Sequence, residues 1–368
     1  MTLKNIHVIL TASLISVLTV MTACENRQVT TVNGIIWGTT YHITTIGDAE
    51  ADPVTIATLT LDSLNGSLNM FDSTSELGRF NSEGQLTASA DFMTVLDESR
   101  QICRLTGGAF DPTVGPLIEY WGFGTSKDFA DTVDMARVER IKSAVGLDKI
   151  DVSGNRIARK CDLTRLDFGA IAKGYAVDRV TEALLKAGYS GAMVEIGGEV
   201  RVAGKKPEGQ AWRIQIDAPV RDTSGTHVRL GILSLTDGAV ATSGNYRNFR
   251  ELSDGRIVGH TISPVTGTPV ETDVMSATII AKSCMKADAL ATAVMVMGSE
   301  RSTRLLDSLT RSEESGVLGA ILVTSKGINT IGLPSPHAVF EPANSVSFRN
   351  YFTHSSGLSL VRSFLTSK

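Results

Sequence analysis

The chain has 368 residues with 35 Lys and Arg against 39 Asp and Glu, and its net charge of −4 gives no electrostatic reason to expect nucleic-acid binding. A hydrophobic fraction of 42% with ordinary charge content supports a large core and excludes a mainly disordered chain. The length alone allows one large domain or two, and the expected partner is a small molecule or another protein.

The first 23 residues have the pattern of an export signal. Lys4 precedes a mostly apolar run over 6–21, and small residues lead to Cys24. The segment 20–24 resembles the bacterial lipobox, in which the Cys is lipidated and becomes the mature N-terminus, although Met21 replaces the usual Leu. We expect a protein of the cell envelope, lipid-anchored through Cys24 to a bacterial membrane on its periplasmic face. A retained membrane anchor, or an unmodified Cys24 and a soluble periplasmic product, are the alternatives.

Helix and strand signals mix along the rest of the chain, without an internal repeat or a linker. The patterns predict helices over 53–70, 92–105, 171–187 and 283–297, and strands over 37–43, 191–202, 212–217, 232–236 and 274–281. This mixture indicates an α/β or α+β chain. The expected organisation is a signal peptide at 1–23, a polar tether at 24–34, one folded domain over 35–335 and a C-terminal tail at 336–368.

Three further cysteines, Cys103, Cys161 and Cys284, are an odd number with no CxxC spacing. The pattern matches neither a disulfide framework nor a zinc site. We expect three small buried side chains.

The segment from Arg165 to Asp178 places a glycine-containing loop in front of an amphipathic helix. Backbone N–H groups at a helix start favour anions, and Lys173 near that start could pair with phosphate oxygens. On this segment alone, the alternative is a lysine exposed on the helix surface.

Asp288 and Thr292 lie four residues apart on a predicted helix, so their oxygens share one face. Two hard oxygen ligands suit Mg²⁺, which leaves positions for phosphate and water. The alternative is an Asp that only stabilises the helix dipole.

His260 lies in a polar segment, 259–267, that follows a second loop-like segment at 242–247. An ordinary pKa of about 6.5 would suit the deprotonation of an attacking hydroxyl, although a structural His is the default interpretation. No GxSxG, GxxxxGKS or HExxH motif occurs, which excludes the commonest hydrolase, nucleotide-kinase and zinc-protease functions. Gly197-Gly198-Glu199 is a glycine turn without the GxGxxG order of a dinucleotide site.

Taken together and in order, nine segments resemble those of the bacterial FAD:protein FMN transferase family, also called the thiamine-biosynthesis lipoprotein family, across about residues 35–335. These segments are Trp37-Gly38-Thr39, 75–81 (SELGRFN), 108–114 (GAFDPTV), 121–124 (WGFG), 167–178, Gly197-Gly198-Glu199, 242–247 (TSGNYR), 260–267 (HTISPVTG) and 287–292 (ADALAT).

The resemblance implies an α+β fold with a T-fold-like core, mixed sheets and packed helices in a single compact catalytic unit, with FAD in an extended cleft. It implies Mg²⁺ bound by the side chains of Asp288 and Thr292 and by backbone oxygens of Ala170 and Ala291. It also implies His260 as the catalytic base. The residues implied to line the FAD site are Trp37, Phe71, Ala109, Phe110, Asp111, Asp167, Lys173 and Ile262.

Two of these positions depart from the family pattern. Phe71 stands where many members have a Tyr that stacks on the isoalloxazine, and Trp37 stands where Met is common. Both substitutions keep a flat or apolar surface, so we expect FAD binding to survive.

The implied activity is Mg²⁺-dependent transfer of FMN from FAD to a Thr hydroxyl of an acceptor protein, with release of AMP. The expected acceptor is a membrane redox subunit with a short Asp/Ser-Gly-Ala-Thr-like motif. Two alternatives remain: a Mg²⁺-dependent FAD pyrophosphatase that yields FMN and AMP, and a non-enzymatic flavin-binding lipoprotein.

Overall fold

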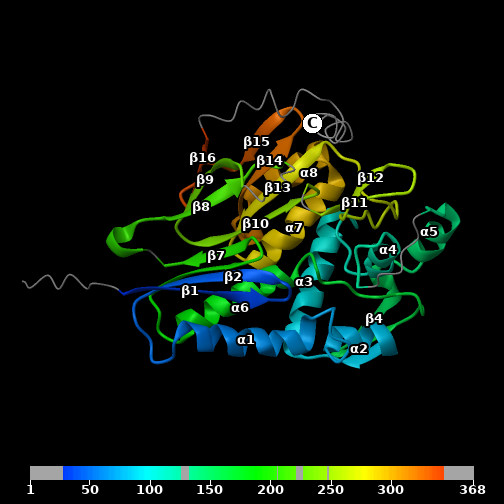
Figure 1. Ribbon diagram of the computed structural model, residues 1–368, viewed down its shortest axis with the longest axis horizontal. Helices are drawn as coiled ribbons and strands as arrows, with labels where there is room; N and C mark the ends of the chain where they lie inside the picture. The colour runs from blue at the N-terminus through cyan, green and yellow to red at the C-terminus, as the bar shows by residue number, and fades with distance from the viewer. Residues whose placement is uncertain (1–27, 126–131, 205, 221–226, 247, 344–368) are drawn as a thin grey trace, which may run out of the picture.

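Strands β1 (Val29–Ile36) and β2 (Thr39–Ile46) form a tight antiparallel hairpin at one edge of the main sheet (Figure 1). The computed structural model describes residues 28–125, 132–204, 206–220, 227–246 and 248–343. The expected signal at 1–23 and Cys24 lie outside these ranges. Within them, no helix is long and apolar enough to cross a bilayer.

The main sheet has eight strands, and each neighbouring pair is antiparallel. After β2 the order across the sheet is β6 (Gly191–Ile196), β7 (Glu199–Ala203), β10 (Gly238–Gly244), β13 (Val274–Ala281), β14 (Val317–Thr324) and β15 (Gly327–Ile331). Three smaller antiparallel sheets are β16 (Ala338–Pro342), β9 (Arg229–Leu235) and β8 (Trp212–Asp217); β3 (Gln85–Thr87), β5 (Arg156–Arg159) and β4 (Ile150–Ser153); and β11 (Phe249–Glu251) with β12 (Ile257–Gly259).

The α-helices of the described residues are α1 (Pro53–Leu68), α2 (Glu76–Glu83), α3 (Ala90–Thr106), α4 (Gly115–Tyr120), α5 (Met135–Lys142), α6 (Ala172–Lys186), α7 (Cys284–Met297) and α8 (Ser299–Thr310). Short 3₁₀ helices lie at Leu147–Lys149, Pro207–Gly209 and Glu313–Ser315. Side-chain caps begin several α-helices: Asp52 accepts two N–H groups of α1, and Ser89 and Ser283 cap α3 and α7. The predicted α+β class is confirmed.

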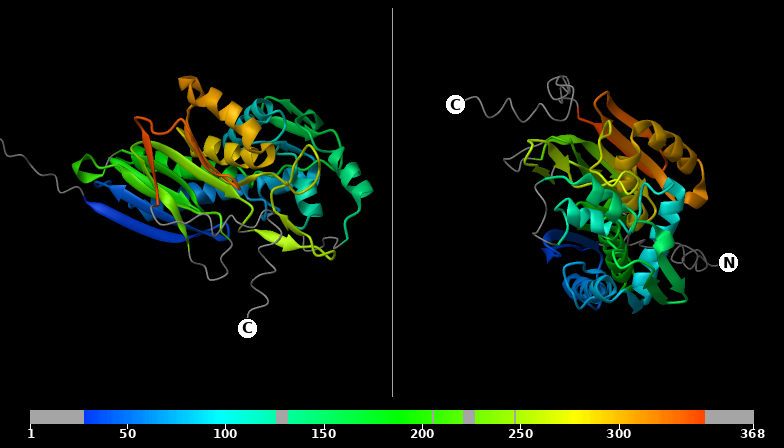
Figure 2. Two further views of the ribbon diagram at one scale, coloured as in Figure 1. Left: turned by 90° about the horizontal axis from the view of Figure 1, so that it is seen from above. Right: turned by 90° about the vertical axis from the view of Figure 1, so that its right-hand side faces the viewer.

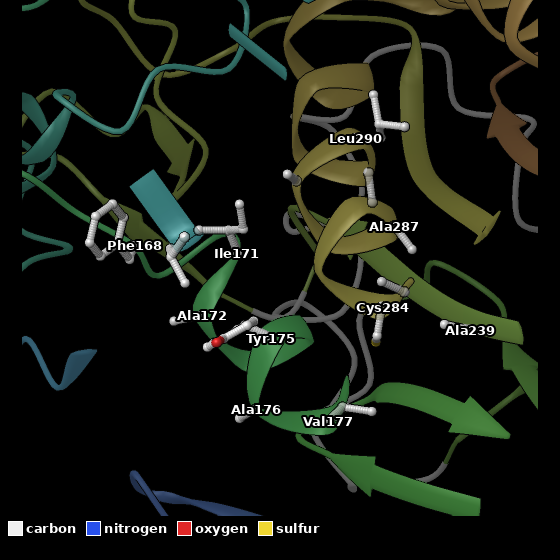
Figure 3. Packing of buried hydrophobic residues seen from close by; sticks show 14 of the residues in the cluster. Phe168, Ile171, Ala172, Tyr175, Ala176, Val177, Ala239, Cys284, Ala287 and Leu290 are labelled. Atoms are coloured by element: carbon white, nitrogen blue, oxygen red, sulfur yellow. The ribbon is translucent and has the colours of Figure 1, made fainter. Parts of the chain in front are cut away.

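The two faces of the main sheet bury separate cores (Figure 2). One face packs against α6, α7 and α8, while α1 and α3 pack on α6 and α7, and small residues lie at the crossing of α6 and α7 (Figure 3). The other face packs against the sheet β16-β9-β8 around Trp212. A third apolar cluster joins α4 and α5 to the segments near β11 and β12, and it includes Trp121 and Ile262.

The structure corrects several predicted boundaries. The predicted strand 37–43 begins at Thr39, because Trp37 and Gly38 form the turn of the hairpin. The predicted strand 191–202 is two strands, since Gly197 and Gly198 adopt positive φ and reverse the chain. Residues 242–244 were expected in a loop but end strand β10, where small polar side chains pair with β13.

The folded body is longer at both ends than the predicted 35–335. Residues 29–34 of the expected tether belong to β1, which hydrogen-bonds to β2 along its whole length although several of its side chains are polar. Residues 338–342 of the expected tail form β16, which pairs with β9 and buries Ala338 in the second core.

The cysteine prediction holds only in part. Cys103, Cys161 and Cys284 are all free thiols, as expected, but only Cys284 is buried. Cys103 lies 3.8 Å from Oδ2 of Asp111, and burial raises its pKa to about 12, so it is no nucleophile at neutral pH.

Candidate functional site

Helices α6 and α7 cross so closely that a side chain at Gly174 has no room. A Cβ there would lie 2.4 Å from the carbonyl oxygen of Cys284 and 2.9 Å from Cβ of Asp288. The Gly174 N–H instead donates to Oδ2 of Asp288 at 3.1 Å. The start of α6 therefore faces the carboxylate that the sequence singles out on α7.

Asp178 of α6 fixes the first turn of α7. Its carboxylate accepts the N–H groups of Cys284 and Met285 and the hydroxyl of Ser283, each at 2.9 Å. Because this turn is fixed, the position of Asp288 one turn later is fixed as well. The motif 167–178 thus positions both helices.

Asp288 is 3% exposed and lies opposite Lys173, the second residue of α6. Burial raises the pKa of Asp288, and the charge of Lys173 opposes that rise. Asp288 is the fifth residue of α7 and accepts an N–H group of α6, so the dipole of its own helix does not explain its position.

Lys173 forms an ion pair with Glu199, with 3.1 Å between Nζ and Oε1. Burial disfavours the ammonium, but Asp288 and Glu199 outweigh this and raise the pKa of Lys173. Burial in turn raises the pKa of Glu199, and Lys173 only partly offsets that rise. Lys173, whose side chain is 31% exposed, is therefore paired with a buried carboxylate rather than fully solvated on the helix surface. Two carboxylates share one ammonium, which favours a further cation at this position.

Thr292 lies one turn beyond Asp288, and its hydroxyl is 3.1 Å from Oγ of Ser243 at the end of β10. Ala170 precedes the N-cap of α6, and Ala291 is buried in α7; since an Ala side chain is a methyl group, each can offer only its backbone oxygen. No cluster of three or more His, Cys, Asp or Glu side chains that could hold a metal exists among the described residues. A metal here therefore needs the hydroxyl, backbone oxygens, water or ligand oxygens besides Asp288.

The residues 109–111 and 167 belong to two loops that the structure joins. The Asp167 N–H donates to the Pro112 carbonyl at 2.7 Å. The side-chain amide of Asn81 donates to the Leu166 carbonyl and accepts the Leu166 N–H, each at 2.8 Å. Oδ1 of Asp167 accepts the Gly169 N–H at 2.7 Å, and burial raises the Asp167 pKa.

Asp111 is held inside its own loop. Its Oδ1 accepts the N–H and the hydroxyl of Thr113, at 2.8 and 2.6 Å, and burial raises its pKa. The side chains of Ala109 and Phe110 are buried, and that of Phe110 packs in the main core. These side chains therefore hold the loop in shape.

His260 directly follows β12. Its Nδ1 lies 3.2 Å from the Asn248 carbonyl, and since a carbonyl only accepts, Nδ1 carries the proton and Nε2 is the basic nitrogen. Burial lowers the His260 pKa, the Asn248 bond opposes this, and the charge of Lys173 lowers it further. His260 is therefore neutral at pH 7 and within electrostatic reach of Lys173.

The neighbours of His260 are anchored on both sides. Oδ1 of Asn245 accepts the Thr261 hydroxyl at 2.7 Å, and Ile262 is buried in the third cluster beside Trp121. The Trp121 indole donates to the Gly267 carbonyl at 2.8 Å. Residues 121–124, 242–246 and 260–267 thus form one support for His260, which sequence spacing could not show.

Trp37 and Phe71 differ in exposure. Trp37 packs partly against the main core, and its indole donates to Oδ1 of Asn65 at 2.8 Å. Phe71 is 69% exposed, which leaves a ring face available for stacking.

The sequence alone did not indicate that Glu199, Asn81, Asn245 or Ser243 contact other residues of the site. All four lie inside the quoted motifs. Glu199 had one usable signal, a carboxylate directly after a strand and a glycine turn, whereas the other three act on segments that only the fold brings near.

Comparisons with known proteins agree with this architecture. The model of the ApbE family matches residues 37–314. FAD:protein FMN transferases from Vibrio cholerae and Haemophilus influenzae are 36% and 33% identical, over 79% and 78% of this chain and 88% and 86% of their own lengths.

Solved structures show the same fold. The flavin transferase ApbE of Vibrio cholerae superimposes with a TM-score of 0.72 at 33% identity, over 83% of this chain and 96% of that one. The Pseudomonas stutzeri flavinyl transferase ApbE, in its apo form, gives 0.71 at 29% identity, over 90% and 98%. The fold expected from the resemblance is confirmed, and the chain belongs to the ApbE family.

Proposed function

We propose that this chain is an enzyme, a FAD:protein FMN transferase that moves FMN from FAD onto a Thr hydroxyl of an acceptor protein. The relatives carry this name. The observation that carries the proposal is the crossing of α6 and α7, which brings Lys173 and Asp288 into one buried cluster within electrostatic reach of His260.

The charges of the cluster suit a pyrophosphate only together with a further cation. FAD brings negative phosphates toward a site with Lys173 but also with Asp288 and Glu199. The donor set fits Mg²⁺: the buried carboxylate of Asp288, the Thr292 hydroxyl, and backbone oxygens of Ala170 and Ala291. When bound, Mg²⁺ would neutralise phosphate charge in the transition state.

The reaction exchanges one P–O bond for another. The acceptor hydroxyl attacks the FMN phosphorus, Nε2 of His260 accepts the hydroxyl proton, and the bond from that phosphorus to the bridging oxygen breaks so that AMP leaves. Lys173 stabilises charge on the phosphate oxygens. Catalysis is mainly positioning and charge stabilisation.

The FAD-binding residues we propose are those implied by the resemblance, with refined roles. Trp37 and Phe71 offer aromatic surface, Lys173 binds the phosphates, Asp167 holds the loop that leads to Lys173, and 109–111 and Ile262 shape the surrounding loops.

A pyrophosphatase would use the same groups with water in place of the acceptor hydroxyl. A binding protein without catalysis is less well supported, because burial and Lys173 keep His260 unprotonated with Nε2 available. Incubation of the purified protein with FAD, Mg²⁺ and a candidate acceptor distinguishes a transferase, a pyrophosphatase and a binding protein. Transfer adds the mass of FMN less one water to the acceptor, hydrolysis releases FMN and AMP without an acceptor, and a binding protein leaves FAD intact.

We also propose a lipid anchor at Cys24, a location at the periplasmic face of a bacterial membrane, and a membrane redox subunit as acceptor. These rest on the lipobox-like segment and on the family resemblance. Mass spectrometry of the mature N-terminal peptide tests the anchor: a chain that starts elsewhere, or an unmodified Cys24, contradicts it and leaves the transferase proposal untouched.

A further inference from the structure

Two asparagines join the aromatic residues of the site into one hydrogen-bonded unit. The indole Nε1 of Trp37 lies 2.8 Å from Oδ1 of Asn65, and the same oxygen lies 2.9 Å from Nδ2 of Asn69. Oδ1 of Asn69 accepts the backbone N–H of Phe71 at 2.9 Å. A continuous chain of hydrogen bonds therefore runs from the β1–β2 turn, along the end of α1, to Phe71.

The direction of every bond in this chain is fixed by its two ends. An indole N–H and a backbone N–H can only donate. Asn65 must therefore present its oxygen to Trp37, and Asn69 must present its oxygen to Phe71 and its amide nitrogen to Asn65. No other orientation of the two amides satisfies both ends.

Neither aromatic residue is what folding alone would select. Trp37 has a φ of 50° in a two-residue turn whose second residue, Gly38, has a φ of 75°, and such turns prefer Asn-Gly. A bulky residue at positive φ is strained, which points to a function. Phe71 is 69% exposed, so most of its ring does not contribute the favourable free energy that burial of apolar surface would give.

The turn that carries Trp37 also lies beside the charged cluster. A Cβ on Gly197 would lie 3.1 Å from the Thr39 side chain and 3.5 Å from Cδ of Lys173. Trp37 is two residues before Thr39, so the hydrogen-bonded aromatic unit begins next to Lys173, the residue proposed to bind the phosphates.

We propose that Asn65 and Asn69 are positioning residues of the flavin site, which hold Trp37 and Phe71 as one aromatic wall against the ring system of FAD. The proposal rests on the proposed function. Asn65 acts through Trp37 and has no contact of its own with the ligand.

A double-mutant cycle tests the link between Trp37 and Asn65. Trp37→Phe keeps a ring but removes the donor, and Asn65→Ala removes the acceptor. Trp37→Phe should weaken FAD binding about fivefold, the value of one hydrogen bond, and Asn65→Ala should weaken it at least as much because it also removes the acceptor for Asn69. The double variant should be no more than about twofold weaker than the weaker single variant, since both changes remove the bond between Trp37 and Asn65.

Two matched variants complete the cycle. Asn65→Asp keeps an oxygen that accepts from both Trp37 and Asn69, and should bind FAD within about twofold of wild type. Ser63→Ala changes an exposed residue of the same helix and should have wild-type affinity.

Ligand fragments and fluorescence distinguish positioning from a merely structural role. FMN carries the ring system and AMP does not, so Asn65→Ala should weaken FMN binding and leave AMP binding unchanged. Trp121 and Trp212 are buried and donate to their own carbonyl partners, so subtraction of the Trp37→Phe spectrum isolates Trp37. In Asn65→Ala that emission should shift to the red, and its quenching by FAD should fall.

The outcomes separate this inference from the proposed function. If the wild-type protein transfers FMN but the two substitutions act additively, or if Asn65→Ala binds FAD like wild type, the inference is wrong and the transferase stands. If AMP binding falls as much as FMN binding, Asn65 acts on the fold and the inference is also wrong. A wild-type protein that does not bind FAD overturns both.

Discussion

The imidazole of His260 can accept a proton at only one nitrogen, because the Asn248 carbonyl engages the other. His260→Gln should therefore leave FAD and Mg²⁺ binding intact and slow FMN transfer about 100- to 10000-fold. Acceptor flavinylation under single-turnover conditions, with FAD binding measured separately by fluorescence, checks this. A variant with wild-type transfer would show that another group takes the proton.

The acid limb of the pH profile follows from the same residue. Burial first, and the charge of Lys173 second, lower the His260 pKa below its ordinary value of 6.5. A base with a lowered pKa stays unprotonated until the pH falls below that value, so kcat/KM should remain high at pH 6.5 and decline only at lower pH. In His260→Gln this decline should be absent, and an unchanged acid limb would assign it to a different group.

Asp288 is the only charged ligand that we propose for the metal. Asp288→Asn keeps an oxygen that can accept the Gly174 N–H, so the contact of α6 with α7 survives while the metal loses its carboxylate. Mg²⁺-dependent transfer should be abolished, whereas Thr292→Ala should cost less because water can replace a hydroxyl. The measurement is flavinylation against Mg²⁺ concentration. Wild-type rate and Mg²⁺ dependence in Asp288→Asn would remove the metal assignment.

The role of a site residue could be predicted from sequence only where the residues that it contacts lie near it in the chain. The motif 167–178 indicated a phosphate-binding lysine, and the structure places Lys173 at the start of a helix as expected. Its ion-pair partner Glu199 was not predicted, since the pair forms only when α6 packs beneath the β6–β7 turn. Asn245, which holds Thr261, is separated from it by the β11–β12 hairpin and gave no signal for the same reason.

At the scale of elements, Asp178 connects α6 to α7 and to the sheet. It pairs with Arg201 of β7 at 2.9 Å besides capping α7. Asp178→Ala leaves a largely buried guanidinium without this partner and should lower the free energy of unfolding by about 3–5 kcal/mol. The control is Glu182→Ala, which removes the exposed partner of the same Arg201 and should cost less than about 1 kcal/mol. Urea unfolding of both variants measures the difference, and similar losses would contradict the assigned role.

Periodic helices were the elements best predicted from sequence. The spacing over 53–70 and 283–297 predicted α1 and α7 within two residues. Strand β14, with the run VLGAILVT, was missed because a strand buried on both faces shows no alternation. The segment 191–202 was predicted as one strand, although a glycine turn at 197–199 was identified, because the apolar pattern continues on both sides of that turn.

At the scale of the whole molecule, the second core depends on β16. A chain that ends at Ser335 lacks the strand that pairs with β9 and the packing of Ala338 and Phe340. Compared with a chain that ends at Ala343, it should lose about 2–4 kcal/mol of stability. Thermal or urea unfolding of the two truncated proteins compares them directly, and equal stability would show that β16 is dispensable. The expected tail at 336–368 missed this strand because its partner lies about a hundred residues earlier.

The contacts that build the site join distant parts of the chain. Gly174 and Asp288 are 114 residues apart, Asp178 and Cys284 are 106 apart, and Asn81 and Leu166 are 85 apart. Each requires the closure of a long loop, so these contacts belong to the slow, late steps of folding. A chain still unfolded for transport across a membrane therefore has no flavin site. If the chain is exported as we propose, the enzyme acquires its activity only after it has reached the compartment where it folds.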